Sequence, residues 1–465
     1  MAMNKTIRLV FALSALGLLL SPARASAHAH LKRSEPAAGS KVESSPQLLR
    51  FWFSEAPELA MTVISLKDSN GKEFPLGAAE GDRGDPLAIS IRVSQSLPAG
   101  RYTVAWRTAA SDGHPSHGIF SFVILEDATL PANAGATQIG ADKDTPPSVT
   151  AASSTTVENE EEAEEASSVV NSLARAFSFL GLLALIGTTS FRTIILPRAR
   201  GIGIELSAQM EQRTSMLGIV ASVLVIVTAF ARLFLEARMM SAMPGMQSMS
   251  MTDMAMHTRW GFALRLELGA AFMALLAFAL AARRVRGAWF VAALMAIVLA
   301  VTPALAGHAA ASPKFTSLMI ASDFLHVLGG GSWLGSLFAV VVVGLPLSLA
   351  LDGAERWSSV AALVNSFSPL ALVSAAIVLI SGVIASWVHL EHLPALWQTA
   401  YGQVLLVKLV LVAITLTVGA YNFRRVQPQL ANEFGSMHLR RSAAVELSFA
   451  FLILLVTGFL TGISP

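Results

Sequence analysis

Cysteine is absent from this chain of 465 residues, and charged residues make up only 14% of it. The lack of cysteine excludes a disulfide framework and every metal site that depends on thiolate ligands. Soluble globular proteins carry about 25% charged residues, so the low charge and a hydrophobic content of 54% indicate a membrane protein. Any metal site must therefore use histidine, methionine, carboxylate or backbone nitrogen as ligands.

The first 27 residues have the pattern of a secretory signal peptide. Lys5 and Arg8 precede an apolar stretch at residues 9–20, and residues 25–27 fit the A-x-A cleavage rule. The alternative is an uncleaved anchor helix, but the apolar stretch is too short to span a hydrocarbon core of roughly 30 Å comfortably. Cleavage after residue 27 makes His28 the first residue of the mature chain.

Composition divides the rest of the chain into three regions. Residues 28–126 alternate short apolar runs with turn residues, which predicts an exported all-β domain. Residues 127–168 are rich in Ser, Thr, Ala and Pro and then in Glu, so we expect a flexible acidic linker without a core. Residues 169–465 are dominated by apolar runs and form the predicted membrane domain.

The apolar runs of the last region predict an all-α polytopic bundle of about eight transmembrane helices, because a bilayer requires roughly 20 residues for each. They lie at residues 169–191, 215–235, 260–282, 287–306, 317–344, 361–387, 403–422 and 443–462. Arginine is concentrated in the alternate connections, at residues 192–214, 283–286, 345–360 and 423–442. The positive-inside rule makes these connections cytoplasmic. We therefore expect a multi-pass protein of the bacterial inner membrane with its N-terminal domain in the periplasm.

Three potential metal ligands stand out in the exported domain, namely His28, Asp112 and His114. The α-amine of a terminal histidine has an ordinary pKa of about 7.7–8.0, so a metal can displace its proton near neutral pH and form a chelate ring with the imidazole. A second imidazole and a carboxylate would complete the tetragonal N,O ligand set that Cu(II) prefers. From spacing alone, it is equally open that His114 is a turn residue and His28 a frayed terminus.

Several segments of this domain together resemble the CopC family of periplasmic copper-binding proteins. They are His28-Ala29-His30-Leu31, Glu35-Pro36-Ala37-Ala38-Gly39, Tyr102-Thr103-Val104-Ala105-Trp106-Arg107, Asp112-Gly113-His114-Pro115 and Gly118-Ile119-Phe120-Ser121-Phe122. The resemblance covers nearly the whole domain. It implies a cupredoxin-like or immunoglobulin-like Greek-key barrel.

The resemblance also implies a ligand set for Cu(II): the terminal amine and imidazole of His28, with Asp112 and His114. We expect His30 to orient one of these ligands through a hydrogen bond, and His117 is a further candidate ligand. Some family members carry an additional methionine-rich Cu(I) site. This domain contains only Met61, so we expect no such site.

Ionisable residues recur toward the predicted outer side of the membrane domain: His308, Asp323, His326, His389 and His392. Such residues are costly within a membrane and are usually functional. Asp323 and His326 are spaced i, i+3 and therefore share one helix face. They are candidates for a copper path, and the alternative is a hydrogen bond that stabilises the bundle.

Methionine is concentrated after the second predicted span. The cluster comprises Met243, Met246, Met249, Met251, Met254 and Met256, followed by His257. Thioethers are soft ligands that suit Cu(I), and the flanking Ser, Gly and Pro argue against a buried core. The cluster is predicted to capture copper; the alternative is an adaptable hydrophobic contact with a partner.

The membrane domain resembles the CopD family of copper membrane proteins in a series of ordered segments. They are Gly307-His308-Ala309, Asp323 to His326 followed by Gly331-Ser332-Trp333-Leu334-Gly335, Ser368-Pro369-Leu370, Tyr401-Gly402 with Lys408, Asn422, and Arg441 to Glu446. The methionine cluster is not part of this resemblance. Together the two resemblances indicate a CopC–CopD fusion.

The sequence thus predicts a non-enzymatic protein that captures Cu(II) outside and passes copper, as Cu(I), inward through the membrane domain. Its expected partners are copper ions, the lipid bilayer, and a periplasmic copper chaperone or reductase; nothing indicates nucleic acid, and no P-loop is present.

One alternative is copper sequestration or sensing without transport. Another is a histidine-brace copper oxidoreductase, whose open coordination position Asp112 would fill. A haem carrier would need facing histidine pairs, and His326 is the only histidine placed within a predicted span.

Overall fold

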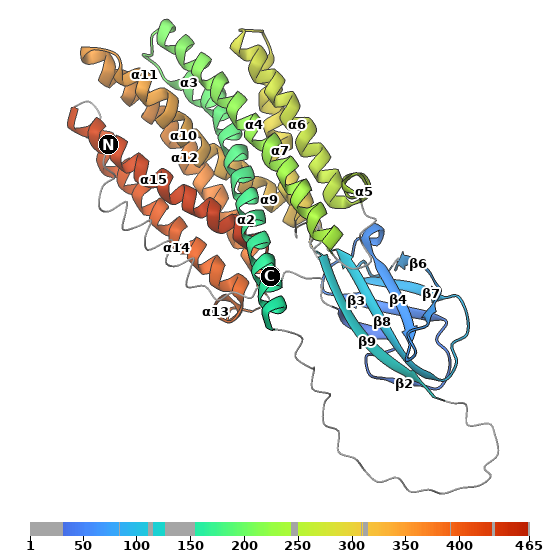
Figure 1. The fold of residues 1–465 in the computed structure, drawn as a ribbon. Coiled ribbons are helices and arrows are strands. Elements are labelled where there is room, and N and C mark those ends of the chain that lie inside the picture. The colour runs from blue at the N-terminus through green and yellow to red at the C-terminus, as the bar shows by residue number, and fades with distance from the viewer. Residues whose placement is uncertain are drawn as a thin grey trace, which may run out of the picture. The chain divides into compact units, whose positions relative to one another are not determined.

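The computed structural model describes residues 31–82, 84–109, 115–125, 154–242, 250–307, 309, 315–390, 392–429 and 433–463. The chain forms two units, one built of β-strands and the other of helices (Figure 1). Both fold classes agree with the prediction of an all-β domain fused to an all-α membrane bundle.

Two sheets make up the β-unit. Its strands are β1 (Leu31–Glu35), β2 (Lys41–Val42), β3 (Leu48–Phe53), β4 (Val63–Asp68), β5 (Glu73–Phe74), β6 (Leu76–Gly81), β7 (Ala88–Val93), β8 (Gly100–Ala109) and β9 (Pro115–Ile124), with a 3₁₀ turn, η1 (Leu59–Met61). The strand orders are β1-β3-β7-β6 and β2-β9-β8-β4-β5. Pairing is antiparallel except between β2 and β9.

Strand β8 shows why the sequence folds this way. Its buried residues alternate with partly exposed ones, so that Tyr102, Val104 and Trp106 face the core, as the period of two in a strand requires. The Trp106 ring lies 5.2 Å from that of Phe53 in the other sheet, measured between centroids. Aromatic contacts across the two layers therefore form the core of the domain.

The helical unit contains the following elements. They are α2 (Ser154–Ser190), η2 (Phe191–Ile195), α3 (Leu196–Arg198), α4 (Ile204–Ala242), α5 (Met251–His257), α6 (Arg259–Ala282), α7 (Ala288–Ala306), α9 (Thr316–Gly330), η3 (Gly331–Gly335), α10 (Ser336–Ala339), η4 (Val340–Gly344), α11 (Leu345–Leu349), α12 (Gly353–His389), α13 (Ala395–Gln398), α14 (Ala400–Tyr421), η5 (Asn422–Val426), η6 (Gln427–Gln429) and α15 (Glu433–Leu460).

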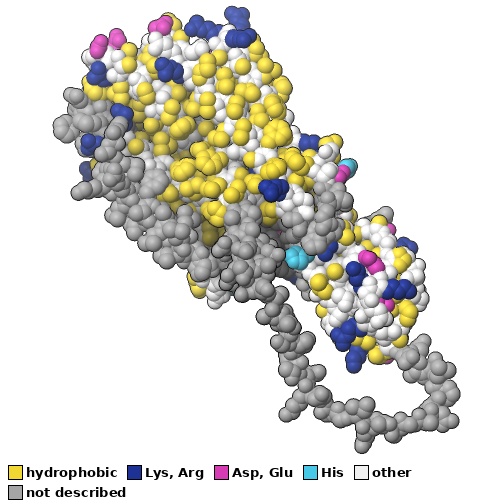
Figure 2. All heavy atoms as spheres, in the orientation of Figure 1, with side chains coloured by type: hydrophobic (Ala, Val, Ile, Leu, Met, Phe, Trp, Pro, Cys, Tyr) yellow, Lys and Arg dark blue, Asp and Glu magenta, His cyan; other side chains and the backbone are white. Residues whose placement is uncertain are grey.

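Eight helices of this unit are long and apolar enough to cross a membrane. They span Val169–Arg198, Ile204–Ser241, Arg259–Ala282, Ala288–Ala306, Thr316–Leu349, Gly353–His389, Ala400–Val426 and Arg440–Leu460. Hydrophobic side chains cover the sides of the bundle, and Lys and Arg gather at its end near α3 and α11 (Figure 2). The chain is therefore a multi-pass membrane protein, and the predicted number of spans is confirmed.

The helices extend further than the apolar runs predicted. The second span begins at Ile204 rather than at residue 215, because the helix continues through polar residues beyond the apolar core. Likewise α2 begins at Ser154, within the segment predicted to be a flexible linker. The physical reason is that Glu and Ala, which dominate residues 158–166, are strong helix formers even where no core is available.

Small residues allow close helix contacts in the interior. Gly331 and Gly335 form a G-x-x-x-G pair on η3. A Cβ on Gly335 would overlap the backbone of Leu183 in α2, and one on Gly331 would overlap Ile186. Such pairs let helix backbones approach closely within a membrane. The contact fixes η3 against α2 at a π-helical turn, a geometry that occurs frequently at functional sites.

Candidate functional site

The predicted metal ligands of the β-unit, His28, His30, Asp112 and His114, lie outside the described residues. The residues that flank them are described. Ala109 and Pro115, on either side of residues 110–114, pair directly with each other across β8 and β9. Leu31, the residue after His30, pairs with Phe53.

These two flanks lie at the same end of the sandwich. Phe53, the partner of Leu31, packs its ring against Trp106, three residues before Ala109 on β8. The amide of Glu58, five residues after Phe53, donates to the Ala109 carbonyl at 2.8 Å. The fold therefore brings the two stretches of chain next to the predicted ligands toward each other.

Two other predicted features of the β-unit are described. His117 lies exposed on β9, opposite Arg107, while its neighbour Ser116 is buried. Met61 ends η1 and is only 1% exposed, so its thioether belongs to the hydrophobic core.

Within the bundle, α9 and α12 meet at a pair of polar side chains. His326 Nδ1 lies 3.0 Å from Ser381 Oγ, and the backbone of Val378 is a second hydrogen-bond partner of the imidazole ring. One turn earlier on α9, Ser322 Oγ donates to the Ser381 carbonyl at 3.0 Å. The imidazole is thus held against α12 through its Nδ1 side.

Helix α14 adds two polar groups to this site. Lys408 interacts electrostatically with both His326 and Asp323, and Tyr401 interacts electrostatically with Asp323. The Tyr401 ring also lies 6.1 Å from that of His389 on α12, between centroids. Three helices therefore contribute to one polar cluster, defined here as Asp323, His326, Ser381, His389, Tyr401 and Lys408.

The start of α14 is fixed by a close turn. Thr399 Oγ1 caps the helix by accepting the amide of Gly402 at 3.0 Å. A side chain at Gly402 would overlap the backbone of Ala395 and Leu396 in α13, so glycine is needed for this approach. The turn positions Tyr401, which is buried, toward the polar cluster.

The other predicted histidines of this region do not join the cluster in the described part of the chain. His392 is exposed between α12 and α13, and His308 lies outside the described residues. No group of three His, Asp or Glu side chains among the described residues is arranged to hold a metal ion. The described residues of the polar cluster therefore do not form a preformed coordination shell.

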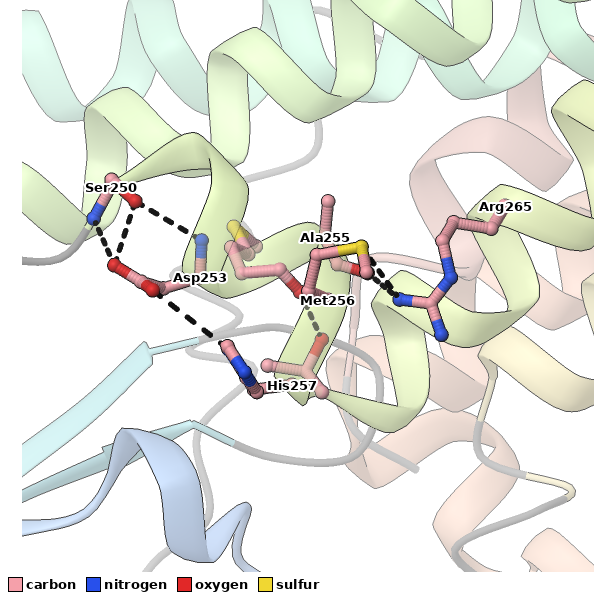
Figure 3. A network of polar contacts seen from close by, with 8 residues as sticks. Ser250, Asp253, Ala255, Met256, His257 and Arg265 are labelled. Carbon is pink, nitrogen blue, oxygen red and sulfur yellow. Dashed lines mark hydrogen bonds and ion pairs between the residues drawn. The ribbon is translucent and has the colours of Figure 1, made fainter.

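The described part of the methionine cluster forms the short helix α5 (Figure 3). Ser250 and Asp253 make a capping box, in which Ser250 Oγ accepts the Asp253 amide at 3.1 Å and donates to Asp253 Oδ2 at 2.7 Å. These hydrogen bonds from Ser250 hold the pKa of Asp253 below its usual range. His257 Nδ1 lies 3.8 Å from Asp253 Oδ1, one turn further along.

The thioethers of α5 differ in their surroundings. Met254 is buried at 1% exposure, whereas Met251 and Met256 are exposed. Arg265 of α6 donates to the Ala255 carbonyl and approaches Met256 Sδ at 3.8 Å (Figure 3). Met243, Met246 and Met249 lie outside the described residues.

A cavity of about 420 Å³ lies on the α11 side of the polar cluster, between η3, η4, α12, α14 and α15. Its walls are mostly apolar, and the buried carboxylate of Glu446 is its main ionisable group apart from Arg424. Asn422 donates to Glu446 at 3.2 Å, and the Trp333 side chain is a second hydrogen-bond partner. Seven residues separate His326 from Trp333, so about 10 Å of helix separates the cluster from the cavity.

Family models match three consecutive regions of the chain. Residues 31–125 match the CopC domain, residues 166–315 the copper resistance protein D-like N-terminal domain, and residues 361–460 copper resistance protein D. The chain belongs to the CopC–CopD copper resistance family.

Relatives agree with this assignment. Copper transport protein CutJ of Bacillus subtilis (strain 168) is 25% identical over 428 residues, which are 89% of this chain and 71% of the relative. Copper resistance protein C of Escherichia coli is 34% identical over 116 residues, 23% of this chain and 90% of the relative. The crystal structure of CopC from Methylosinus trichosporium OB3b shares 30% identity and is matched over its whole length by 22% of this chain, with a TM-score of 0.21.

Within this CopC–CopD chain, sequence reasoning found Asp323, His326 and His389 of the polar cluster. It named Tyr401 and Lys408 only as part of a CopD-like segment, and it missed Ser381. A signal for Ser381 was present. The buried serines Ser366, Ser374 and Ser381 of α12 are spaced by eight and seven residues, which places them on one helix face. Tyr401 carries no such pattern, because its place depends on the turn between α13 and α14.

Proposed function

We propose that this CopC–CopD protein imports copper across the bacterial inner membrane. The periplasmic domain captures Cu(II), and the membrane domain takes up copper as Cu(I) and moves it inward. The observation that carries the transport proposal is the polar cluster between α9, α12 and α14. A cluster with Asp323, His326 and Lys408 inside a bilayer is costly unless it serves a polar cargo.

In the periplasmic domain, we propose that the amine and imidazole of His28, together with Asp112 and His114, bind Cu(II). The approach of the flanking residues at one end of the sandwich supports this ligand set. His30 is proposed to orient a ligand through a hydrogen bond. His117 remains a candidate, since its exposed side chain lies on the strand that follows His114.

In the membrane domain, His326 is proposed to be the main copper ligand of the polar cluster. With Nδ1 held by Ser381, Nε2 on the other side of the imidazole is the nitrogen that can bind a metal. His389 and Asp323 would supply the neighbouring binding groups. Weak, separate groups suit a transport path, because an ion must both enter and leave each position.

The methionine cluster is proposed to receive Cu(I) at the outer side, since thioethers prefer the reduced ion. Met251, Met256 and His257 are exposed and available for this role. Met243, Met246 and Met249, which lie outside the described residues, are proposed to share it. Met254 is buried and would instead hold α5 in place. His308 and His392 are proposed as additional outer positions on the path. Because the ion captured outside is Cu(II), a periplasmic reductase or a chaperone delivering Cu(I) is an expected partner.

Placement in the inner membrane with a periplasmic N-terminal domain follows from the arginine-rich alternate connections. Tethering the two domains in one chain raises the local concentration of copper near the membrane. No enzymatic activity is proposed. Sequestration or sensing without transport would use the same periplasmic ligands, so the test must separate transport from binding.

That test is the copper content of a deletion strain carrying the wild-type gene or the variant Asp323→Ala plus His326→Ala. We expect the wild type to raise cytoplasmic copper and the double variant to leave it at the level of the deletion strain. A matched control is Ser366→Ala, on the same face of α12 as Ser381 but remote from the cluster. If the deletion strain accumulates more copper than the wild type, import is wrong and the protein serves efflux or sequestration.

A further inference from the structure

Two carboxylates are buried in the first spans of the bundle, and they differ in their hydrogen-bond partners. Glu236 is on α4 and is 2% exposed, and Glu267 is on α6 and is 8% exposed. Both face α2 through hydrogen bonds and both have an arginine partner. Comparing the two shows whether either carboxylate has an oxygen that the contacts between helices leave without a partner.

Both oxygens of Glu267 have partners. Its Oε1 accepts Ser178 Oγ at 3.2 Å, and its Oε2 pairs with Arg232. A buried carboxylate that is paired in this way needs no further ligand. Its role is accounted for by the contact between α2, α4 and α6.

Glu236 is different, because all its contacts converge on one oxygen. Its Oε1 accepts Asn171 Nδ2 at 2.9 Å and lies 3.4 Å from Arg175 Nη2. Its Oε2 is buried without a hydrogen-bond partner, and so is Asn171 Oδ1. Leaving such a buried acceptor unsatisfied costs about 1–3 kcal/mol, and more for a charged group. The two unpaired oxygens on contacting residues are therefore acceptors that a cation or a water molecule can satisfy.

A sulfur atom belongs to the same group. Met239 is on the face of α4 that carries Glu236, one turn further along, and its Sδ lies 3.8 Å from Asn171 Nδ2. Asn171 Nδ2 thus contacts both Glu236 Oε1 and Met239 Sδ, while its own Oδ1 and the Oε2 of Glu236 are without a hydrogen-bond partner. Carboxylate, amide oxygen and thioether are then available to one cation.

We propose that Glu236, Asn171 and Met239 form a transient binding site for Cu(I). The proposal rests on the proposed function, and it identifies a copper position between the methionine cluster and the bundle interior. Helix α4 ends at Ala242 and leads directly into residues 243–249, which hold three of the predicted Cu(I) ligands. A soft cation leaving those thioethers meets Met239 next along the helix.

The charge of the site fits a monovalent ion in transit. Arg175 neutralises Glu236, so a bound monovalent ion leaves one net positive charge and a divalent ion leaves two. A net charge of two is far more costly than a net charge of one in a low-dielectric region. A weak site with one thioether also releases its ion readily, as a conduction path requires.

The experiment compares four single variants of the full-length protein, in nanodiscs for the binding of Ag(I) as the probe for Cu(I) and in sealed proteoliposomes for copper uptake. Glu236→Gln and Met239→Leu alter the proposed site. Glu267→Gln is the matched control for a buried carboxylate with an arginine partner, and Met240→Leu is the control for a buried methionine on the same helix. Size-exclusion profiles report folding, and Ag(I) stoichiometry and copper uptake per folded molecule are the readouts.

We expect Glu236→Gln and Met239→Leu each to lose one bound Ag(I) and to lower copper uptake about tenfold, since loss of groups at a metal site typically costs 10–100-fold. Met240→Leu should retain the wild-type Ag(I) stoichiometry and stay within twofold in uptake. Glu267→Gln should lower the yield of folded protein, because Arg232 loses its charged partner, but each folded molecule should keep the wild-type Ag(I) stoichiometry. If Glu236→Gln does not fold, Met239→Leu decides the question alone.

The site proposal is overturned if the Met239→Leu and Glu236→Gln proteins bind as much Ag(I) as their controls, which would mean that the two oxygens hold water. Failure of the proposed function gives a different result. In that case the wild-type protein takes up no copper, yet the loss of one Ag(I) in the site variants still supports the binding site.

Discussion

Helices α12 and α14 differ from the other spans in how much of their surface is covered. Within the bundle only 11% of the span on α12 and 17% of that on α14 is buried, whereas the other six spans are 39–61% buried. The first four spans pack through small residues, with Ala221, Ala271, Ala274 and Ala292 almost fully buried. Yet α12 and α14 contribute Ser381, His389, Tyr401 and Lys408 to the polar cluster, so these are the helices that we propose to act in transport.

From this contrast we expect two kinds of polar group, those that hold the bundle together and those proposed to bind the transported copper. In the first spans, the Arg232–Glu267 pair lies inside a closely packed region. Around α12 and α14, polar residues adjoin a cavity and loosely covered helices. Moving elements are drawn from the least stable parts of a protein. We expect mutations in the first group to change stability and mutations in the second to change transport.

The largest effect is expected from Glu267→Ala. Removal of this carboxylate leaves the Arg232 charge buried and uncompensated, which costs about 3–5 kcal/mol. The thermal unfolding temperature in detergent should fall sharply, along with the yield of folded protein. The comparison variant His326→Ala, which removes no charged partner of Lys408, should unfold at a temperature much closer to wild type. Equal losses of stability in the two variants would remove the distinction between the two regions.

A smaller but specific effect is expected from His326→Ala. Loss of the imidazole should lower copper uptake by about tenfold or more, while the unfolding temperature changes little because the surrounding helices are loosely packed. Uptake and unfolding are measured on the same preparation. Ser381→Ala should give a weaker loss, because it removes only the group that orients Nδ1. A His326→Ala protein with normal uptake would exclude the cluster from the path.

Filling the cavity tests whether α12 and α14 must move relative to each other. Ala375 lines the cavity, and its neighbour Ala376 is exposed on the outer face of α12. Ala375→Phe should slow uptake several-fold, because the added ring fills space that the two helices would need in order to move, whereas Ala376→Phe should have no effect. Initial uptake rates of the two variants check this. Equal rates would show that the cavity plays no part in transport.

The smallest expected effect is a pH dependence of stability in the closely packed β-unit. Burial, with a contribution from the Asp68 charge, raises the pKa of Tyr102, whose hydroxyl donates to the Pro98 carbonyl at 2.8 Å. The neutral phenol stabilises the folded state fully below about pH 10, the unfolded pKa, and this contribution is lost as the pH rises through the folded pKa.

Hydrogen exchange of β8 at pH 9 and pH 11 measures this dependence. We expect exchange to accelerate with pH more strongly in the wild type than in Tyr102→Phe, after correction for the intrinsic rates. Tyr421→Phe serves as the control, since Tyr421 is exposed at 55%. The same acceleration in wild type and Tyr102→Phe would exclude the buried phenol as its cause.

The sequence predicted the architecture well because long apolar runs and alternating strands are local signals. It underestimated the lengths of α2 and α4, because the polar ends of these helices carry no hydropathy signal. Asp323 and His326 were found because charges within an apolar run are conspicuous. The Glu236–Asn171–Met239 group was not, because its members come from two helices 65 residues apart and only packing brings them together.

The most direct test of import through the polar cluster is copper accumulation in sealed proteoliposomes supplied with Cu(I) under ascorbate. Wild-type protein and the Asp323→Ala plus His326→Ala variant are reconstituted at equal density, beside protein-free vesicles. The account predicts that only wild-type vesicles accumulate copper above the protein-free level. Equal accumulation by the double variant, or none by the wild type, would contradict it.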